Sequence, residues 1–117
     1  MKKSSFLTSL VLACCLSTVA FAQNSGGYTG PALSQITVKE AKKLSDDKPV
    51  VLVGKIEKGL GGEKYLFKDA TDSVTIEIDD DKWRGLTVGP EDLIEIRGEV
   101  DKDFTSFKID VDSVVKK

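Results

Sequence analysis

The chain has 117 residues, 17 of them basic and 19 acidic, which is the length of one small domain with a single modest core. It contains no histidine, so it lacks the commonest general base and the commonest transition-metal ligand. Acidic and basic residues are mixed, whereas a nucleic-acid-binding protein normally carries a basic patch or stripe. These features exclude a Ser-His-Asp catalytic site and argue against a nucleic-acid binder.

Residues 1–22 predict a secretory signal peptide. Lys2 and Lys3 precede an apolar run with small residues, and the AFA triplet that ends at Ala22 fits a small-x-small cleavage site. A transmembrane anchor fits less well, because the run is short and has no basic stop. Lipoprotein processing at Cys14 also fits less well, because apolar residues continue beyond that cysteine. We therefore expect cleavage after Ala22 and export.

Cleavage would leave residues 23–117 as the mature chain. Cys14 and Cys15 both lie within the signal peptide, so the mature chain is expected to form no disulfide. Loss of the two lysines of the signal peptide leaves 15 basic and 19 acidic residues, a net charge of −4. Residues 23–34 begin with QNSGGYTGP and predict a flexible leader, and residues 35–117 form the expected folded domain.

One short amphipathic helix is expected at the start of this domain. Thr37 followed three residues later by Glu40 is a capping box, which predicts a helix that begins near Val38. Its apolar positions at helical spacing are Val38, Ala41 and Leu44. The segment SDDKP, which ends at Pro49, is expected to end the helix.

Alternating apolar and polar residues predict strands over most of the remaining sequence. The predicted strands cover residues 50–59, 64–69, 74–79, 93–100 and 107–115. Gly54, inside the first of them, predicts a bulge or a sharp bend of the kind used at barrel corners. Residues 80–93 are too polar for a strand and predict a helical turn around Lys82–Arg84.

These elements predict an all-β fold, a small closed antiparallel barrel. Strands with one apolar and one polar face bury their edges by closing into a barrel. The five-stranded Greek-key OB barrel has the same order of elements: three strands, a short helical link and two more strands. The alternative is an open sheet with the amphipathic helix on one face. In the barrel, the expected inward side chains include Phe67, Ile76, Ile96 and Ile109.

Several segments of the mature chain carry a resemblance to a known family. They are GGYTGP, ITVKEAKKLSDD, YLFKDATDSVTIEIDDDKWRG, IRGEVDKD and FKIDVDSV. The sequence resembles the bacterial OB-fold (BOF) family of small periplasmic stress-tolerance proteins. The resemblance implies an OB barrel exported to the periplasm, with a role in tolerance of oxidants, metals or antimicrobial compounds. The family is not known as enzymatic, so the resemblance implies no catalytic residue and supplies no ligand site.

The outer face of the first three predicted strands is the candidate ligand-binding surface, because OB folds commonly bind ligands there. Its candidate residues are Lys55, Glu57, Lys64, Lys68, Thr75 and Glu77. Tyr65 and Phe67 are expected to point into the barrel, so this face has no aromatic ring on which a base could stack. Cross-strand ion pairing on a wet surface is the alternative interpretation of its charges.

Two further features are candidate sites, the acidic turns and Trp83. A calcium loop that starts at Asp79 would need glycine at its sixth position, where Arg84 stands, and a loop that starts at Asp101 has Ser106 there. We therefore interpret Asp79–Asp81 as solvated turn carboxylates and expect no metal. Trp83 is expected to plug one end of the barrel together with Leu86; the alternative is an exposed ring that stacks on a ligand.

The sequence thus predicts a non-enzymatic binding protein with no cofactor. We expect a small polar or charged ligand or an envelope protein as its partner, and no nucleic acid. After removal of the signal peptide we expect no membrane insertion and a monomer. The alternative is a structural or protective interaction protein that binds no small ligand.

Overall fold

The computed structural model describes residues 32–117; the predicted signal peptide and most of the predicted leader lie outside these residues. The elements in chain order are α1 (Val38–Ala41), β1 (Pro49–Gly61), β2 (Lys64–Lys68), β3 (Ser73–Glu77), the 3-10 helix η2 (Asp80–Trp83), β4 (Ile94–Lys102) and β5 (Phe107–Lys116). None of the helices in the described part has the length and apolar character needed to cross a bilayer.

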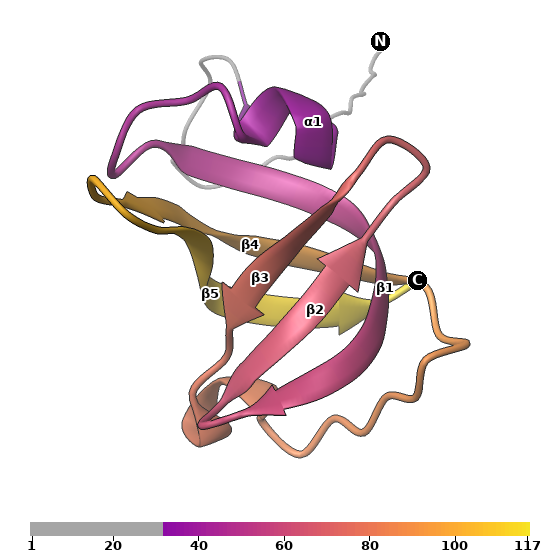
Figure 1. Ribbon diagram of the computed structural model, residues 1–117. Coiled ribbons are helices and arrows are strands. Elements are labelled where there is room, and N and C mark those ends of the chain that lie inside the picture. The colour runs from indigo at the N-terminus through magenta and orange to yellow at the C-terminus, as the bar shows by residue number, and fades with distance from the viewer. Residues whose placement is uncertain (1–31) are drawn as a thin grey trace, which may run out of the picture. The chain divides into compact units, whose positions relative to one another are not determined.

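The five strands form a closed barrel in the order β1-β2-β3-β5-β4, as Figure 1 shows. All neighbouring strands are antiparallel except β3 and β5, which run parallel. The long strand β1 makes closure possible, because it pairs with β4 over Pro49–Gly54 and with β2 over Lys55–Gly61. The predicted five-stranded Greek-key OB barrel is confirmed, and the open-sheet alternative is wrong.

Gly54 lies where β1 changes partners, and its role differs in part from the prediction. The register shifts of β1 fall further along, between Ile56 and Lys58 and between Gly59 and Gly61, so Gly54 itself is not a bulge. A Cβ atom on Gly54 would lie 2.2 Å from the carbonyl oxygen of Lys68. Glycine is therefore required here because β1 bends closely against β2, which agrees with the expected barrel corner.

The barrel interior is filled by the apolar side chains that alternate along the strands. Phe67, Ile76, Ile96 and Ile109, the predicted inward residues, are all fully buried. The side of the strand that was predicted to face the core is therefore confirmed for β2, β3, β4 and β5. Two residues of α1 add to this core, since Val38 and Ala41 are also fully buried.

The helix α1 is shorter than expected. The predicted capping box is present: the Thr37 hydroxyl accepts a hydrogen bond from the Glu40 amide, and the Glu40 carboxylate accepts one from the Thr37 amide. The helix nevertheless ends at Ala41. The following polar segment bonds to β4 instead of continuing the helix, because the Asp47 amide donates to the carbonyl of Val100 at 2.8 Å.

Candidate functional site

The outer side of the β1–β2 hairpin carries four lysines that we call the lysine face: Lys55, Lys58, Lys64 and Lys68. The register places Lys55 directly opposite Lys68, and it places Lys58 opposite Leu66. Opposed residues of an antiparallel pair project on the same side of the sheet, so these side chains share one surface. Within residues 32–117, no member of the lysine face forms an ion pair.

Of the other predicted site residues, Thr75 and Glu77 lie on this surface, whereas Glu57 does not follow the expected alternation of inward and outward positions along β1. Thr75 lies opposite Leu66, and Glu77 lies opposite Lys64. Glu57 sits in the register shift between Ile56 and Lys58, which breaks the alternation of β1. The shift brings Lys58 onto the face, a residue that the sequence analysis missed because nothing in the local sequence indicates a bulge there.

A surface hollow with a volume of about 470 Å³ borders the same surface on β2 and β3. It is lined by Lys42, Leu66, Ser73, Val74, Thr75, Lys102 and Phe107. Lys42 is paired with Asp72 at 3.1 Å, whereas Lys102 forms no ion pair within the described residues. The hollow thus places further basic side chains and two hydroxyl groups beside the lysine face.

Glu77 is ion-paired with Lys108 on the neighbouring strand β5, and Lys108 also lies 3.3 Å from Asp101. The hydrogen bond from Lys108 holds the pKa of Glu77 below its ordinary value of 4.5. The same hydrogen bond raises the pKa of Lys108. Because Glu77 is already engaged by Lys108, it neutralises the lysine face less than the sequence suggests.

The lowered pKa of Glu77 predicts how stability depends on pH. An acid whose folded-state pKa is lowered stabilises the fold above its unfolded pKa and loses this contribution as pH falls through the folded pKa. Glu77→Gln should therefore lower the free energy of unfolding at pH 7 by up to about 1 kcal/mol, and this difference should shrink as the pH falls below 4.5. Urea denaturation across this range measures it.

Glu57→Gln is the matched control for this prediction, because Glu57 lies on the neighbouring hairpin and forms no ion pair within the described residues. It should leave the free energy of unfolding at pH 7 close to that of the wild type. A difference between wild type and Glu77→Gln that is constant from pH 7 to acid would contradict the role assigned to the Lys108 pair.

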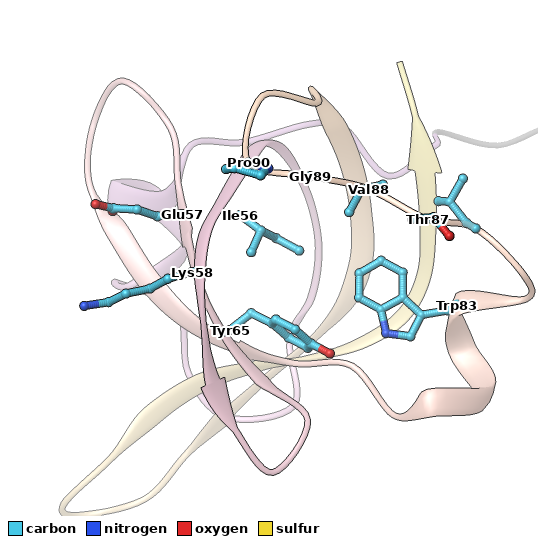
Figure 2. A pocket seen from close by; sticks show the side chains of 11 residues that line it. Ile56, Glu57, Lys58, Tyr65, Trp83, Thr87, Val88, Gly89 and Pro90 are labelled. Atoms are coloured by element: carbon cyan, nitrogen blue, oxygen red, sulfur yellow. The ribbon is translucent and has the colours of Figure 1, made fainter.

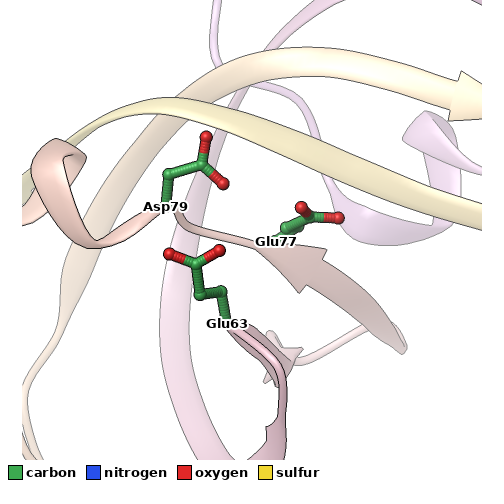
Figure 3. Close-up of side chains that lie close together, drawn as sticks. All are labelled: Glu63, Glu77 and Asp79. Carbon is green, nitrogen blue, oxygen red and sulfur yellow. The ribbon is translucent and has the colours of Figure 1, made fainter.

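Three carboxylates converge where β3 ends, as Figure 3 shows: Glu63, Glu77 and Asp79 have oxygens within 4.8 Å of one another. Two of them already have protein donors, because Glu63 accepts a hydrogen bond from the amide of Asp80 at 2.7 Å and Glu77 is paired with Lys108. We interpret the group as a hydrogen-bonded acidic turn and assign no metal to it. No local sequence pattern indicates that these three residues meet, because they come from a turn and from the end of a strand that are distant in sequence.

Trp83 lies at one end of the barrel, where it contacts the core on one side and borders a hollow on the other. Its ring meets that of Tyr65 edge to face, with 5.7 Å between the centroids. The hollow has a volume of about 420 Å³, and Figure 2 shows Ile56 and Val88 on its walls. Trp83 is therefore an incomplete plug, since it closes the core but leaves a space outside it.

The closed five-stranded barrel with a short 3-10 link between β3 and β4 is an OB fold. Residues 17–116 match the family model of the bacterial OB fold (BOF) protein. The chain belongs to this family.

Individual relatives agree with this assignment. Protein YgiW of Escherichia coli is 40% identical over 119 residues, which cover 91% of each chain. A solved structure of ygiW from E. coli superposes with a TM-score of 0.72 and 45% identity, covering 80% of this chain and all of that chain. The calcium-regulated OB-fold protein CarO of Pseudomonas aeruginosa is 42% identical over 100 residues, which cover 84% of each chain.

Proposed function

We propose that this BOF protein is exported to the periplasm and serves there as a non-enzymatic binding module in envelope stress tolerance. We further propose that the lysine face binds an anionic ligand. The predicted signal peptide and the family resemblance support the compartment and the role. The observation that carries the ligand class is the opposed pair of Lys55 and Lys68, which has no acidic partner within the described residues.

Two like charges directly opposite each other destabilise a pair of strands. Elsewhere on the described barrel, some basic residues meet carboxylates: Lys82 lies 3.9 Å from Asp112, and Lys116 lies 3.7 Å from Asp92. The lysine face differs in that four lysines without an ion pair share one surface, although the chain as a whole is acidic. A bound anion would supply the missing counter-charge, and the hydroxyl of Thr75 would add a neutral donor beside it.

A compact anion fits this surface better than a nucleic-acid strand. Binding of single strands uses aromatic platforms for the bases as well as cations for the backbone. Phe67 is fully buried and Tyr65 turns towards Trp83, so neither ring is available on the lysine face. The ligand class is therefore a small molecule or headgroup that bears phosphate or several carboxylates.

Titration with inorganic tripolyphosphate tests the proposal. The double variant Lys55→Gln/Lys68→Gln should bind tripolyphosphate at least about tenfold more weakly, because each charged contact contributes about 1.5–3 kcal/mol or less after screening. The matched control is Lys116→Gln/Lys117→Gln, which removes the same charge from lysines that have carboxylate partners. Calorimetry in about 0.15 M salt measures the affinities.

Equal affinity of the double variant and the control would exclude the lysine face as the site. Micromolar binding of a labelled single-stranded oligonucleotide in about 0.15 M salt would replace the compact anion by nucleic acid as the ligand class. Spermine, a polycation, should not bind to this face and serves as the ligand control.

The alternative is a protective protein that contacts envelope proteins and binds no small ligand. One observation favours it: Phe104, in the β4–β5 turn, is fully exposed. The turn is held in shape by Asp103, whose carboxylate accepts hydrogen bonds from the amides of Thr105 and Ser106, both at 2.9 Å. A rigid turn that presents an aromatic ring to solvent is suited to anchoring a partner.

Cross-linking in stressed cells separates the two functions. If a cross-linked envelope protein is lost in Phe104→Ser but retained in Lys55→Gln/Lys68→Gln, the protective function is favoured. If the partner is lost only in the lysine variant, the lysine face carries the contact. Phe104→Ser should leave the unfolding midpoint unchanged, because this side chain makes no contribution to the buried core.

A further inference from the structure

The hollow beside Trp83 is separate from the lysine face in its chemistry, and it points to a second ligand. We propose that it is a binding site for a small neutral aromatic molecule that carries one hydroxyl or carbonyl group. The site is built by the second half of β1, by Tyr65 on β2, and by η2 with the link that follows it. It goes beyond the proposed anion binding, and neither proposal depends on the other.

The size and the walls of the hollow suit a compact apolar molecule. Its volume of about 420 Å³ falls in the range of about 300–1,000 Å³ that is typical of small-molecule sites. The apolar side chains that line it are Ile56, Tyr65, Trp83, Leu86, Val88 and Pro90. An aromatic ring in this space would gain area burial and ring contacts with Tyr65 and Trp83.

The charged side chains at the border of the hollow do not point into it. Glu57 and Lys58 belong to the lining, but Figure 2 shows both side chains pointing away from the space between Tyr65 and Val88. A charge that entered the hollow would therefore lose water without gaining a counter-charge, which is unfavourable. The ligand is for this reason a neutral molecule.

Besides the hydroxyl of Thr87, which also lines the hollow, two polar atoms on aromatic rings are available to the single polar group of the ligand. The phenol oxygen of Tyr65 and the indole nitrogen of Trp83 are turned towards each other in Figure 2. Within residues 32–117, neither atom has a hydrogen-bond partner from the protein. The polar ends of Tyr and Trp rings in partly buried positions usually find a partner. An oxygen on the ligand would accept from the indole N–H and bond the phenol.

The path of the backbone after η2 shapes one side of the hollow. The helix η2 is only four residues long, and Arg84 and Gly85 after it both have positive φ, which turns the chain away from the helix. The link is then held by a hydrogen bond from the Gly89 amide to the Asp92 carboxylate at 2.8 Å. Residues 86–90 of this link line the hollow.

The single tryptophan of the chain makes the test direct, because the indole N–H of Trp83 gives one signal of its own in a nitrogen–proton correlation spectrum. Titration of the wild-type protein with phenol should shift this signal to saturation. Benzoate at pH 7, which has a similar ring but a negative charge, should bind at least about tenfold more weakly because its charge is desolvated without compensation. Equal affinities for phenol and benzoate would overturn the proposal.

Variants of the lining provide the second arm. Val88→Phe should fill the hollow and abolish phenol binding, while Val115→Phe, a matched change on the exposed side of β5, should leave it intact. Tyr65→Phe should weaken phenol binding about fivefold but leave toluene binding unchanged, because only phenol uses the lost hydroxyl. Unchanged phenol binding in a folded Val88→Phe protein would refute the site.

Should Val88→Phe fail to fold, as its spectrum would show, the comparison of phenol with toluene in Tyr65→Phe decides. Equal weakening of both ligands there would refute the assigned hydrogen bond and with it the proposed ligand class. The double variant Lys55→Gln/Lys68→Gln should bind phenol with wild-type affinity. Loss of tripolyphosphate binding with retained phenol binding would show two independent sites, and loss of both would contradict the inference.

Discussion

Gly54→Ala is expected to lower the free energy of unfolding by at least about 3 kcal/mol, and so to unfold a marginally stable barrel of this size. The added Cβ would lie 2.2 Å from the carbonyl oxygen of Lys68 and 2.9 Å from the ring of Phe67. The first neighbour is backbone, so it cannot move without opening the pairing of β1 and β2. Relief of the clash would require β1 to move away from β2 at the bend where β1 changes partners.

Gly59→Ala is the matched control in the same strand. A Cβ at Gly59 would meet only the ring of Tyr65, at 3.9 Å, which is ordinary contact. Urea denaturation followed by circular dichroism compares the two variants. If Gly54→Ala unfolds at the same urea concentration as Gly59→Ala, the close approach of β1 and β2 is not a determinant of stability.

Phe67→Ala should cost about 3–5 kcal/mol, because truncation of a large buried ring removes its transfer free energy and leaves a cavity. Phe67 is fully buried and packs against Gly54, so the closed barrel has little freedom to collapse around the gap. Losses of about 2–5 kcal/mol are expected for Ile76→Ala, Ile96→Ala and Ile109→Ala.

Phe104→Ala, which removes the same ring from a fully exposed position, is the control and should leave stability within about 0.5 kcal/mol of wild type. Thermal or urea unfolding of the two Phe variants side by side is the measurement. An unchanged midpoint in Phe67→Ala would mean that β2 presents its other face to the interior. The lysine face would then be placed wrongly as well, because Lys68 follows Phe67 in the alternation.

Much of the fold was predictable because it rests on local patterns. Alternation with a period of two identified the inward residues of the strands, and the Thr37–Glu40 capping box identified the start of α1. The order of strands and link then predicted the OB barrel, since few arrangements bury every edge of so small a sheet. Of the candidate surface, Lys55, Lys68 and Thr75 were correctly placed on outward positions by the same alternation.

What the sequence by itself determined was therefore the strands and the side of each strand that faces the core. Tertiary structure alone decided which groups meet. The register shift in β1 brought Lys58 onto the lysine face, and Lys108 reached Glu77 from a strand 31 positions away. The hollow at Trp83 likewise depends on the path of the link. Pairing register and loop path are set by contacts between distant segments, so no local pattern encodes them.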